Sequence, residues 1–189
     1  MLIAFHKPYG IVSQFTSDGA RTETLAVFGF PPRVYPIGRL DADSEGLLLL
    51  SDEPELNDRL LHPRHGHARE YWCEVERVPS PDSLARLSAG VVIQGRKTMA
   101  CTVRAIDPQP TIPARVPPIR SRASVPTRWI SIELAEGKNR QVRRMTAAIG
   151  HPTLRLIRVR VGRFRLENLA QGEWRRLSDR EHALVLADG

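Results

Sequence analysis

Cysteine and long apolar runs are the scarcest features of this chain. Its 189 residues include only two cysteines, Cys73 and Cys101, which do not form a CxxC pair. This spacing predicts buried thiols in a reducing compartment rather than a disulfide framework or a zinc site. No run of 18 apolar residues occurs, and Lys7 and Pro8 interrupt the N-terminal apolar patch before a signal-peptide core develops. We therefore expect a cytoplasmic protein that does not span a membrane.

Metal-ligand patterns are also sparse. Three histidines lie in residues 62–67 (HPRHGH), but no carboxylate or cysteine completes a usual ligand spacing around them. A chain of this length buries about 70% of its unfolded surface, so it needs no metal to fold. The sequence leaves no amphipathic seam over for self-association. We expect no metal and a monomer.

Positive charge is abundant and unevenly distributed. The chain carries 28 Lys and Arg against 21 Asp and Glu, a formal net charge of +7. Residues 1–60 are acidic, with 5 basic and 9 acidic side chains, whereas residues 138–180 carry 12 basic and 3 acidic ones. Eleven of those twelve are arginines, which bind phosphate in bidentate fashion and stack on bases. This distribution favours a polyanionic partner such as nucleic acid over a merely basic surface.

Apolar periodicity predicts an α+β fold with a mainly antiparallel sheet. Strands are expected at residues 2–5, 46–50, 71–76 and 129–136, and as two strands within 154–166 whose phase slips near Gly162. In the strand at 129–136, Ile130, Ile132 and Leu134 are expected to share one apolar face. Helices are expected at residues 54–61, from Ser80-Pro81 onward, and at about 139–149. Six prolines between Asp107 and Pro126 predict a long extended loop. The elements lack regular βαβ alternation, which favours α+β over α/β.

Two motifs are suited to chemistry on a polyanion. Residues 38–46 (GRLDADSEG) place carboxylates in a glycine-bounded turn before a buried strand, although such a turn can also be solvated surface. Residues 136–145 (EGKNRQVRRM) combine a helix N-terminus with four cations, which suits a phosphate. An arginine of this helix can equally hold a catalytic carboxylate in its ionised form, and an exposed basic helix would have the same pattern.

Taken in order, these motifs resemble the RsuA-type pseudouridine synthase family. The resemblance rests on residues 6–9 (HKPY), residues 38–50, Tyr71 at the start of a strand, and residues 137–145 (GKNRQVRRM). Residues 117–129 and 152–158 further resemble the branch of the family that acts on large-subunit ribosomal RNA. Together these segments cover nearly the whole chain.

The resemblance implies a fold and a division of the chain. It implies the pseudouridine synthase fold, a mainly antiparallel mixed sheet with flanking helices and a central catalytic cleft. Residues 1–62 would carry the aspartate motif, and residues 63–189 the tyrosine strand and the basic helix. We expect no S4-type RNA-binding domain, so that RNA affinity would come from the catalytic domain and weaken steeply with salt.

The resemblance also implies an activity, the isomerisation of a specific uridine to pseudouridine in 23S ribosomal RNA. Asp41 would be the nucleophile, Tyr71 would stack on the flipped-out uracil, and Arg143 would pair with Asp41. Members of the family with this pattern use no metal and no organic cofactor. Whether Asp41 attacks C1′ or removes a proton from C2′ is left open by the sequence.

Further residues are expected to contact RNA. Arg39 would enter the base stack near the position that the uridine vacates. The complete predicted set is Arg39, Lys138, Asn139, Arg140, Arg144, Arg155 and Arg158. Two alternatives remain open: a non-catalytic RNA-binding factor of ribosome assembly, and the same reaction on small-subunit ribosomal RNA or tRNA.

Overall fold

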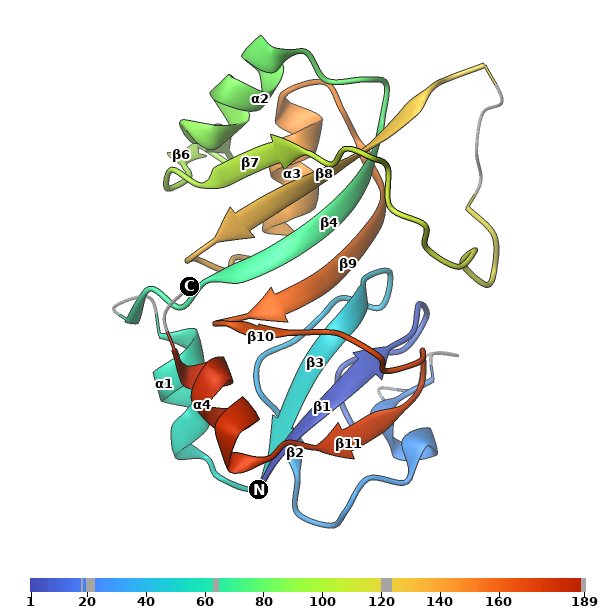
Figure 1. Ribbon diagram of the computed structural model, residues 1–189, viewed down its shortest axis with the longest axis vertical. Coiled ribbons are helices and arrows are strands. Elements are labelled where there is room, and N and C mark those ends of the chain that lie inside the picture. Colours follow the sequence, from blue (N-terminus) through green and yellow to red (C-terminus); the bar gives the residue numbers. More distant parts are fainter. Residues whose placement is uncertain (18, 20–22, 63–64, 120–123, 188–189) are drawn as a thin grey trace. The chain divides into compact units, whose positions relative to one another are not determined.

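The computed structural model describes residues 1–17, 19, 23–62, 65–119 and 124–187 and divides the chain into two compact units (Figure 1). The first unit comprises Met1–Arg69 and Ile157–Gly189, and the second comprises Glu70–Leu156. None of the helices in the described part of the chain is long and apolar enough to cross a membrane.

The first unit is built around the buried strand β3 (Glu45–Ser51). It pairs antiparallel with β1 (Leu2–Lys7) and with the short β2 (Tyr35–Pro36), and β1 pairs in turn with β11 (Trp174–Arg176). Every residue of β3 is buried, as its continuous apolar run predicts for a strand covered on both faces.

Strand β9 (Thr153–Val161) joins this sheet parallel to β3, unlike β1 and β2. Ile157 and Arg158 pair in parallel with Glu45 and Gly46 of β3. At Gly162 the chain turns back, and β10 (Phe164–Arg165) pairs antiparallel with the end of β9. The predicted pair of strands with a phase change near Gly162 is confirmed.

Two apolar layers cover the two faces of β3. On one face, Leu47 and Leu49 pack with residues of helices α1 (Glu55–Leu61) and α4 (Asp179–Leu186). On the other side of the sheet, Phe5 contacts the rings of Phe28 and Phe30 at centroid distances of 4.7 and 5.1 Å. The short 3-10 helix η1 (Leu25–Phe28) supplies the first of these rings.

Helix α4 was not predicted from the sequence. Its N-terminus is a capping box in which Ser178 Oγ accepts from the Glu181 backbone N–H and the Glu181 carboxylate accepts from the Ser178 N–H. Arg175 also pairs with Glu181 at 2.6 Å. Hydrogen bonds from Arg175 and Ser178 lower the pKa of Glu181 to about 2.

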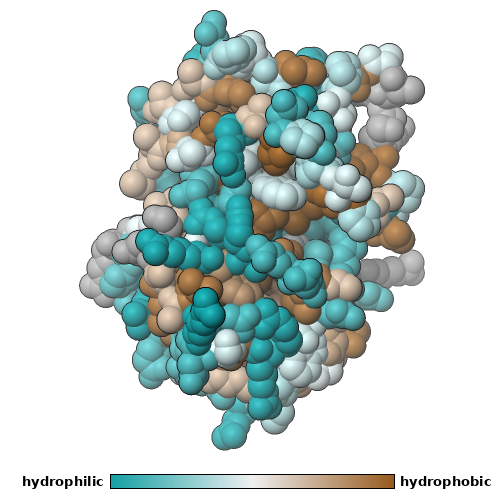
Figure 2. All heavy atoms as spheres, viewed as in Figure 1, coloured by the Kyte–Doolittle hydropathy of each residue, from teal (hydrophilic) through white to brown (hydrophobic). Residues whose placement is uncertain are grey.

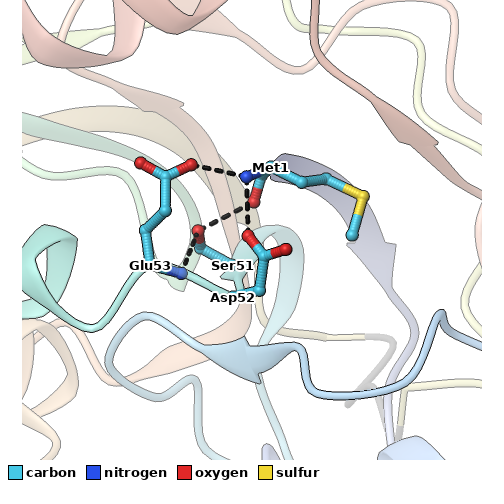
Figure 3. A network of polar contacts seen from close by, with 4 residues as sticks. All are labelled: Met1, Ser51, Asp52 and Glu53. Carbon is cyan, nitrogen blue, oxygen red and sulfur yellow. Dashed lines mark hydrogen bonds and ion pairs between the residues drawn. The ribbon is translucent and has the colours of Figure 1, made fainter.

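The start of β1 is tied to the end of β3 by polar contacts, which Figure 3 shows. Ser51 Oγ donates to the Met1 carbonyl at 2.8 Å and accepts from the Glu53 backbone N–H at 3.0 Å. The amino group of Met1 donates to Asp52 at 2.6 Å and to Glu53 at 2.5 Å. These contacts fix the register in which Leu2 faces Ser51.

In the second unit, β8 (Thr127–Leu134) lies between β4 (Arg69–Glu76) and β7 (Thr102–Ala105), and it pairs antiparallel with β7. Strands β5 (Val92–Ile93) and β6 (Arg96–Lys97) form a separate two-stranded sheet. Helices α2 (Pro81–Ser88) and α3 (Gln141–Ala148) contribute to the core on one face of the larger sheet.

The predicted core of this unit is confirmed. Ile130, Ile132 and Leu134 of β8 are all buried on the face that packs against Leu87 of α2 and Met145 of α3. The predicted α+β class is also confirmed, because helices and a mainly antiparallel sheet alternate irregularly along the chain. Within the described residues of 107–126, no helix or strand forms, as the six prolines predict.

Candidate active site

Asp41 lies in a tight turn that leads directly into β3. The Ser44 backbone N–H donates to the Asp41 carbonyl at 3.0 Å, which closes the turn. Asp41 itself is half-buried, and every residue from Ser44, where the turn closes, to Ser51 is buried. The predicted acidic turn therefore directly precedes a strand whose residues are all buried, which limits the movement of the turn and of the carboxylates that it carries.

A second segment braces the backbone on both sides of Asp41. Before it, Leu40 donates its N–H to Ser13 Oγ at 3.0 Å and accepts from the same hydroxyl at 2.8 Å. After it, the Ala42 carbonyl accepts from the Gly10 N–H at 2.7 Å. Ser13 is only 5% exposed, so its two hydrogen bonds to Leu40 are shielded from competing water. The sequence did not reveal this brace, because Ser13 and Leu40 are 27 residues apart.

Lys7 is a fully buried cation beside the same turn. Its Nζ donates to the carbonyls of Ile11 at 2.6 Å and Pro8 at 2.9 Å. Burial lowers the pKa of Lys7 to about 8, although the carboxylates of Glu45, Asp43 and Asp41 act in the opposite direction. The segment that carries Lys7 was recognised in the sequence, but a role for this side chain was not.

Gly46 permits the close approach of β3 and β9. Its φ is +101°, and a Cβ atom there would overlap the backbone N and O of Arg158. The Arg158 side chain is 4% exposed and donates from Nε to the Leu47 carbonyl at 2.7 Å. Backbone contact and side-chain hydrogen bond together hold the strand that follows Asp41 against β9.

The second unit holds Tyr71 and Arg143, the other two predicted catalytic residues. Tyr71 is half-buried on β4, on the face that also carries Cys73. Arg143, on α3, donates from Nη1 to the Thr153 carbonyl at 3.2 Å. Burial raises the pKa of the Cys73 thiol strongly, and the charge of Arg143 acts against that rise. Tyr71 and helix α3, which carries Arg143, therefore lie on the same face of β4.

The predicted basic helix begins later than expected. Helix α3 starts at Gln141, because Arg140 at its N-cap adopts the left-handed conformation with φ 50°. Gln141 orders the preceding loop: its Oε1 accepts from the Lys138 N–H at 2.9 Å, and its Nε2 donates to Glu136 at 2.5 Å. Lys138, Asn139 and Arg140 are thereby displayed on an ordered, exposed loop.

The remaining predicted RNA-contacting residues differ in exposure. Arg39 is exposed beside the Asp41 turn. Arg144 is half-buried and donates to Gln94 at 2.6 Å and to Asn139 at 3.1 Å. Arg155 and Arg158 are each only 4% exposed, and Arg155 donates to the Pro113 carbonyl at 2.8 Å.

No group of three potential metal-binding side chains occurs among the residues that the structure describes. His67 instead contacts the Val185 carbonyl through Nε2 at 2.5 Å, at the end of α4. The two cysteines are free thiols.

Comparison with known proteins gives consistent matches. Residues 1–148 match the family model described as RNA pseudouridylate synthase. The chain is 48% identical over 176 residues to "Ribosomal large subunit pseudouridine synthase E" of Xanthomonas campestris pv. campestris, covering 93% of this chain and 94% of that protein. It is 45% identical to the protein of the same name from Vibrio vulnificus, over 94% of this chain and 75% of that one.

More distant relatives extend the comparison. "Dual-specificity RNA pseudouridine synthase RluF" of Escherichia coli is 35% identical over 96% of this chain and 56% of its own length. A solved structure described as "Crystal structure of pseudouridylate synthase" superposes with a TM-score of 0.80 at 24% identity, over 97% of this chain and 73% of that one. The predicted pseudouridine synthase fold is thereby confirmed.

Proposed function

Because the chain belongs to the RNA pseudouridylate synthase family, we propose that it isomerises a specific uridine of 23S ribosomal RNA to pseudouridine. The enzyme class follows from the family. The choice of large-subunit RNA is supported by the names of relatives that match this chain over most of its length. The observation that carries the chemical part of the proposal is the braced turn that holds Asp41.

Asp41 acts as the nucleophile in this proposal. Its carboxylate either bonds to C1′ of the ribose or takes the proton from C2′, and in both cases the C1′–N1 bond breaks with its electron pair going to uracil. The uracil turns, and C5 bonds to C1′ as the Asp41–C1′ bond breaks on the first route, or as C2′ takes its proton back from Asp41 on the second. The C5 proton is then lost and N1 gains a proton, so the product is an isomer of the substrate. No oxidant or reductant is needed.

Tyr71 and Arg143 assist this reaction in different ways. Tyr71 offers an aromatic face on which the flipped-out uracil stacks, and such stacking recovers about 1–3 kcal/mol of the unstacking cost. Arg143 pairs with the Asp41 carboxylate and holds it in position. Water must be excluded from the site, because hydrolysis of the intermediate at C1′ would leave the detached uracil unable to rejoin the ribose.

RNA affinity is assigned to the basic residues. Arg39, Lys138 and Arg140 are the exposed cations of the predicted set. Arg144 donates a hydrogen bond to Asn139 and thereby orders the loop that carries Lys138 and Arg140. The contributions of Arg155 and Arg158 remain predictions. Neutralising phosphates releases counterions, so the logarithm of the binding constant should fall linearly with the logarithm of salt concentration. We place this activity in the cytoplasm and expect a monomeric enzyme.

Tritium release from C5-labelled uridine in unmodified 23S rRNA transcript tests the proposal. We expect the wild type to release tritium and Asp41→Asn to release none, while the dissociation constant for RNA changes little. Asp43→Asn is the matched control, because it removes one negative charge from the same turn. Turnover by Asp41→Asn would refute the role given to Asp41.

The same assay separates the alternatives. Small-subunit ribosomal RNA and tRNA are included as substrates, because the Escherichia coli relative is named a dual-specificity enzyme. Release from one of these RNAs alone would move the target away from the large subunit. Tight RNA binding with no release from any of them, including partly assembled subunits, would indicate a non-catalytic assembly factor.

A further inference from the structure

The proline-rich connection between β7 and β8 borders a cavity in the second unit. Figure 1 shows this connection (yellow-green to yellow) running out from the ends of the two strands. The cavity has a volume of about 510 Å³, within the range usual for ligand sites. Neither Tyr71 nor Arg143 lines it, so it is distinct from the catalytic residues of this unit.

The floor of the cavity is the sheet face opposite the apolar core. Trp129 alternates along β8 with the buried Ile130, and Glu74 alternates along β4 with the buried Cys73. Trp129 and Glu74 both line the cavity and are half-buried. An indole that lines a cavity on this sheet face provides a flat apolar surface of the kind on which nucleic acid bases stack.

The connection itself forms the opposite wall. Ile112 and Ile119 line the cavity from this side, and both are half-buried in the described part of the connection. Gln109 anchors the start of the connection, because its Oε1 accepts from the backbone N–H of Trp129 at 2.8 Å. In Figure 2, apolar residues (brown) lie beside hydrophilic ones in the region of the surface where this connection runs. A flat ligand can therefore be held between two apolar walls.

Two arginines bring positive charge to the cavity. Arg115 donates from Nε to the Pro117 carbonyl at 2.9 Å and from Nη2 to the Pro118 carbonyl at 3.2 Å. Arg155 donates to the Pro113 carbonyl at 2.8 Å. These hydrogen bonds hold the guanidinium groups in fixed positions at the wall, where their charge attracts an anion without a large loss of side-chain entropy.

One acidic group also lines the cavity. The Glu74 carboxylate accepts from Thr127 Oγ1 at 2.9 Å, and both residues are in the lining. A carboxylate repels phosphate but accepts hydrogen bonds from the N–H groups of a base edge. The cavity thus offers an aromatic surface, a base-edge acceptor and cations at separate places.

We propose that this cavity binds one unpaired nucleotide of the RNA substrate, with its base against Trp129 and its phosphate drawn to the Arg115 side. The identity of the RNA rests on the proposed function, whereas the binding site rests on the cavity. An unpaired nucleotide combines a flat base, N–H donors at the base edge and a negative charge. Binding a nucleotide other than the reacting uridine gives the enzyme a second point at which to select its RNA.

Equilibrium binding of unmodified 23S rRNA transcript tests the proposal. Trp129→Leu keeps an apolar side chain but removes the stacking face, and should raise the dissociation constant about five- to a hundredfold. Trp129→Phe keeps a stacking face and should stay within about threefold of the wild type, in line with the sequence tolerance of aromatic stacking. Equal affinity of the Leu and Phe variants would overturn the proposal.

A second pair of variants guards against a folding defect in Trp129→Leu. Ala114 is exposed and lines the cavity, so Ala114→Leu fills space that the nucleotide would need. Ala85 is an exposed residue of α2 outside the lining, and Ala85→Leu is its matched control. We expect weaker RNA binding for Ala114→Leu alone, with thermal unfolding unchanged in both. Wild-type affinity of Ala114→Leu would contradict the proposal.

A spectroscopic measurement locates the nucleotide directly. The chain has three tryptophans, and replacing Trp72 and Trp174 with Phe leaves Trp129 as the only one. Its fluorescence should be quenched on addition of RNA and saturate with the binding curve, whereas unchanged fluorescence would overturn the proposal. None of these readouts requires turnover. Failure of the tritium assay would therefore count against the proposed reaction, and failure of these experiments against the nucleotide site.

Discussion

Ser13 satisfies both backbone polar groups of Leu40, the residue directly before Asp41. Its hydroxyl accepts from the Leu40 N–H at 3.0 Å and donates to the Leu40 carbonyl at 2.8 Å. Ser13 and Leu40 are 5% and 6% exposed, so water cannot readily replace the hydroxyl. The position of the Asp41 backbone thus depends on a side chain from a distant part of the first unit.

Replacing Ser13 with Ala should slow catalysis more than it weakens RNA binding. The variant leaves two buried backbone groups unpaired, at a cost of about 1–3 kcal/mol in the free energy of unfolding. Misplacement of a reacting group by about 1 Å can lower a rate by about a hundredfold. We expect the single-turnover rate at saturating RNA to fall at least about tenfold, with a dissociation constant close to that of the wild type.

Ser13→Thr retains a hydroxyl and serves as the control, with partial recovery of the rate expected. A Ser13→Ala variant that unfolds at a lower temperature but turns over at the wild-type rate would show that the brace supports stability alone.

Replacing Gly46 with Ala should damage the fold of the first unit. The substitution adds a Cβ at a φ of +101° and drives it into the backbone of Arg158. Strain in this region of φ costs about 1–3 kcal/mol, and backbone overlap adds to it. Chemical denaturation should show a loss of at least about 2 kcal/mol in the free energy of unfolding.

Gly10→Ala is the comparison for Gly46. Gly10 also has a positive φ, of 87°, but a Cβ there would contact no other atom within 4 Å. Gly10→Ala should therefore lose less free energy of unfolding than Gly46→Ala, and the difference between the two variants measures the effect of the close approach between β3 and β9. Equal losses for both variants would contradict this account.

Lys7 should make stability depend on pH above neutrality. Burial lowers the pKa of Lys7 to about 8 in the folded protein, against 10.5 for the unperturbed group. Between these values the unfolded chain binds more protons than the folded one, so the free energy of unfolding rises with pH in this window. Below about pH 8 both states are protonated, and the cost of burying the charge is constant, at about 3 kcal/mol.

Comparison of the wild type with Lys7→Met isolates this effect. Denaturant unfolding between pH 7.5 and 10.5 should show that the difference in stability between the two proteins changes in favour of the wild type as pH rises. The thiols of Cys73 and Cys101 contribute equally to both proteins and cancel. A difference that stays constant over this range would mean that Lys7 titrates normally in the folded state.

Local sequence patterns determined much of the fold. The run 46–50 predicted a buried strand, and the alternation of Ile130, Ile132 and Leu134 predicted the core face of β8. Proline content alone predicted the extended connection before β8. These features follow from side-chain periodicity and backbone restriction, which act over a few residues and need no knowledge of the partner surfaces. The order of motifs likewise indicated the family and placed Asp41 in a turn.

Other features were decided by the tertiary structure. Arg155 and Arg158 look like surface cations in the sequence, yet both are buried and donate to the carbonyls of Pro113 and Leu47. Helix α4 has a capping box that is visible in the sequence, but its burial depends on packing against β10 and the core of the first unit. Backbone carbonyls and apolar faces that accept these groups come from distant segments, and such pairings leave no periodic signal in the sequence.

The brace on Asp41 and the cavity beside Trp129 show the same division. The sequence by itself determined which residues are chemically suited to the reaction and to RNA, namely a carboxylate in a turn and cations near a helix. Only the tertiary structure decided that Ser13 would hold the turn and that a proline-rich connection would border a cavity on the sheet face opposite the core. The reason is physical. A hydrogen bond or a cavity between segments that are far apart in the sequence forms only when folding brings those segments together.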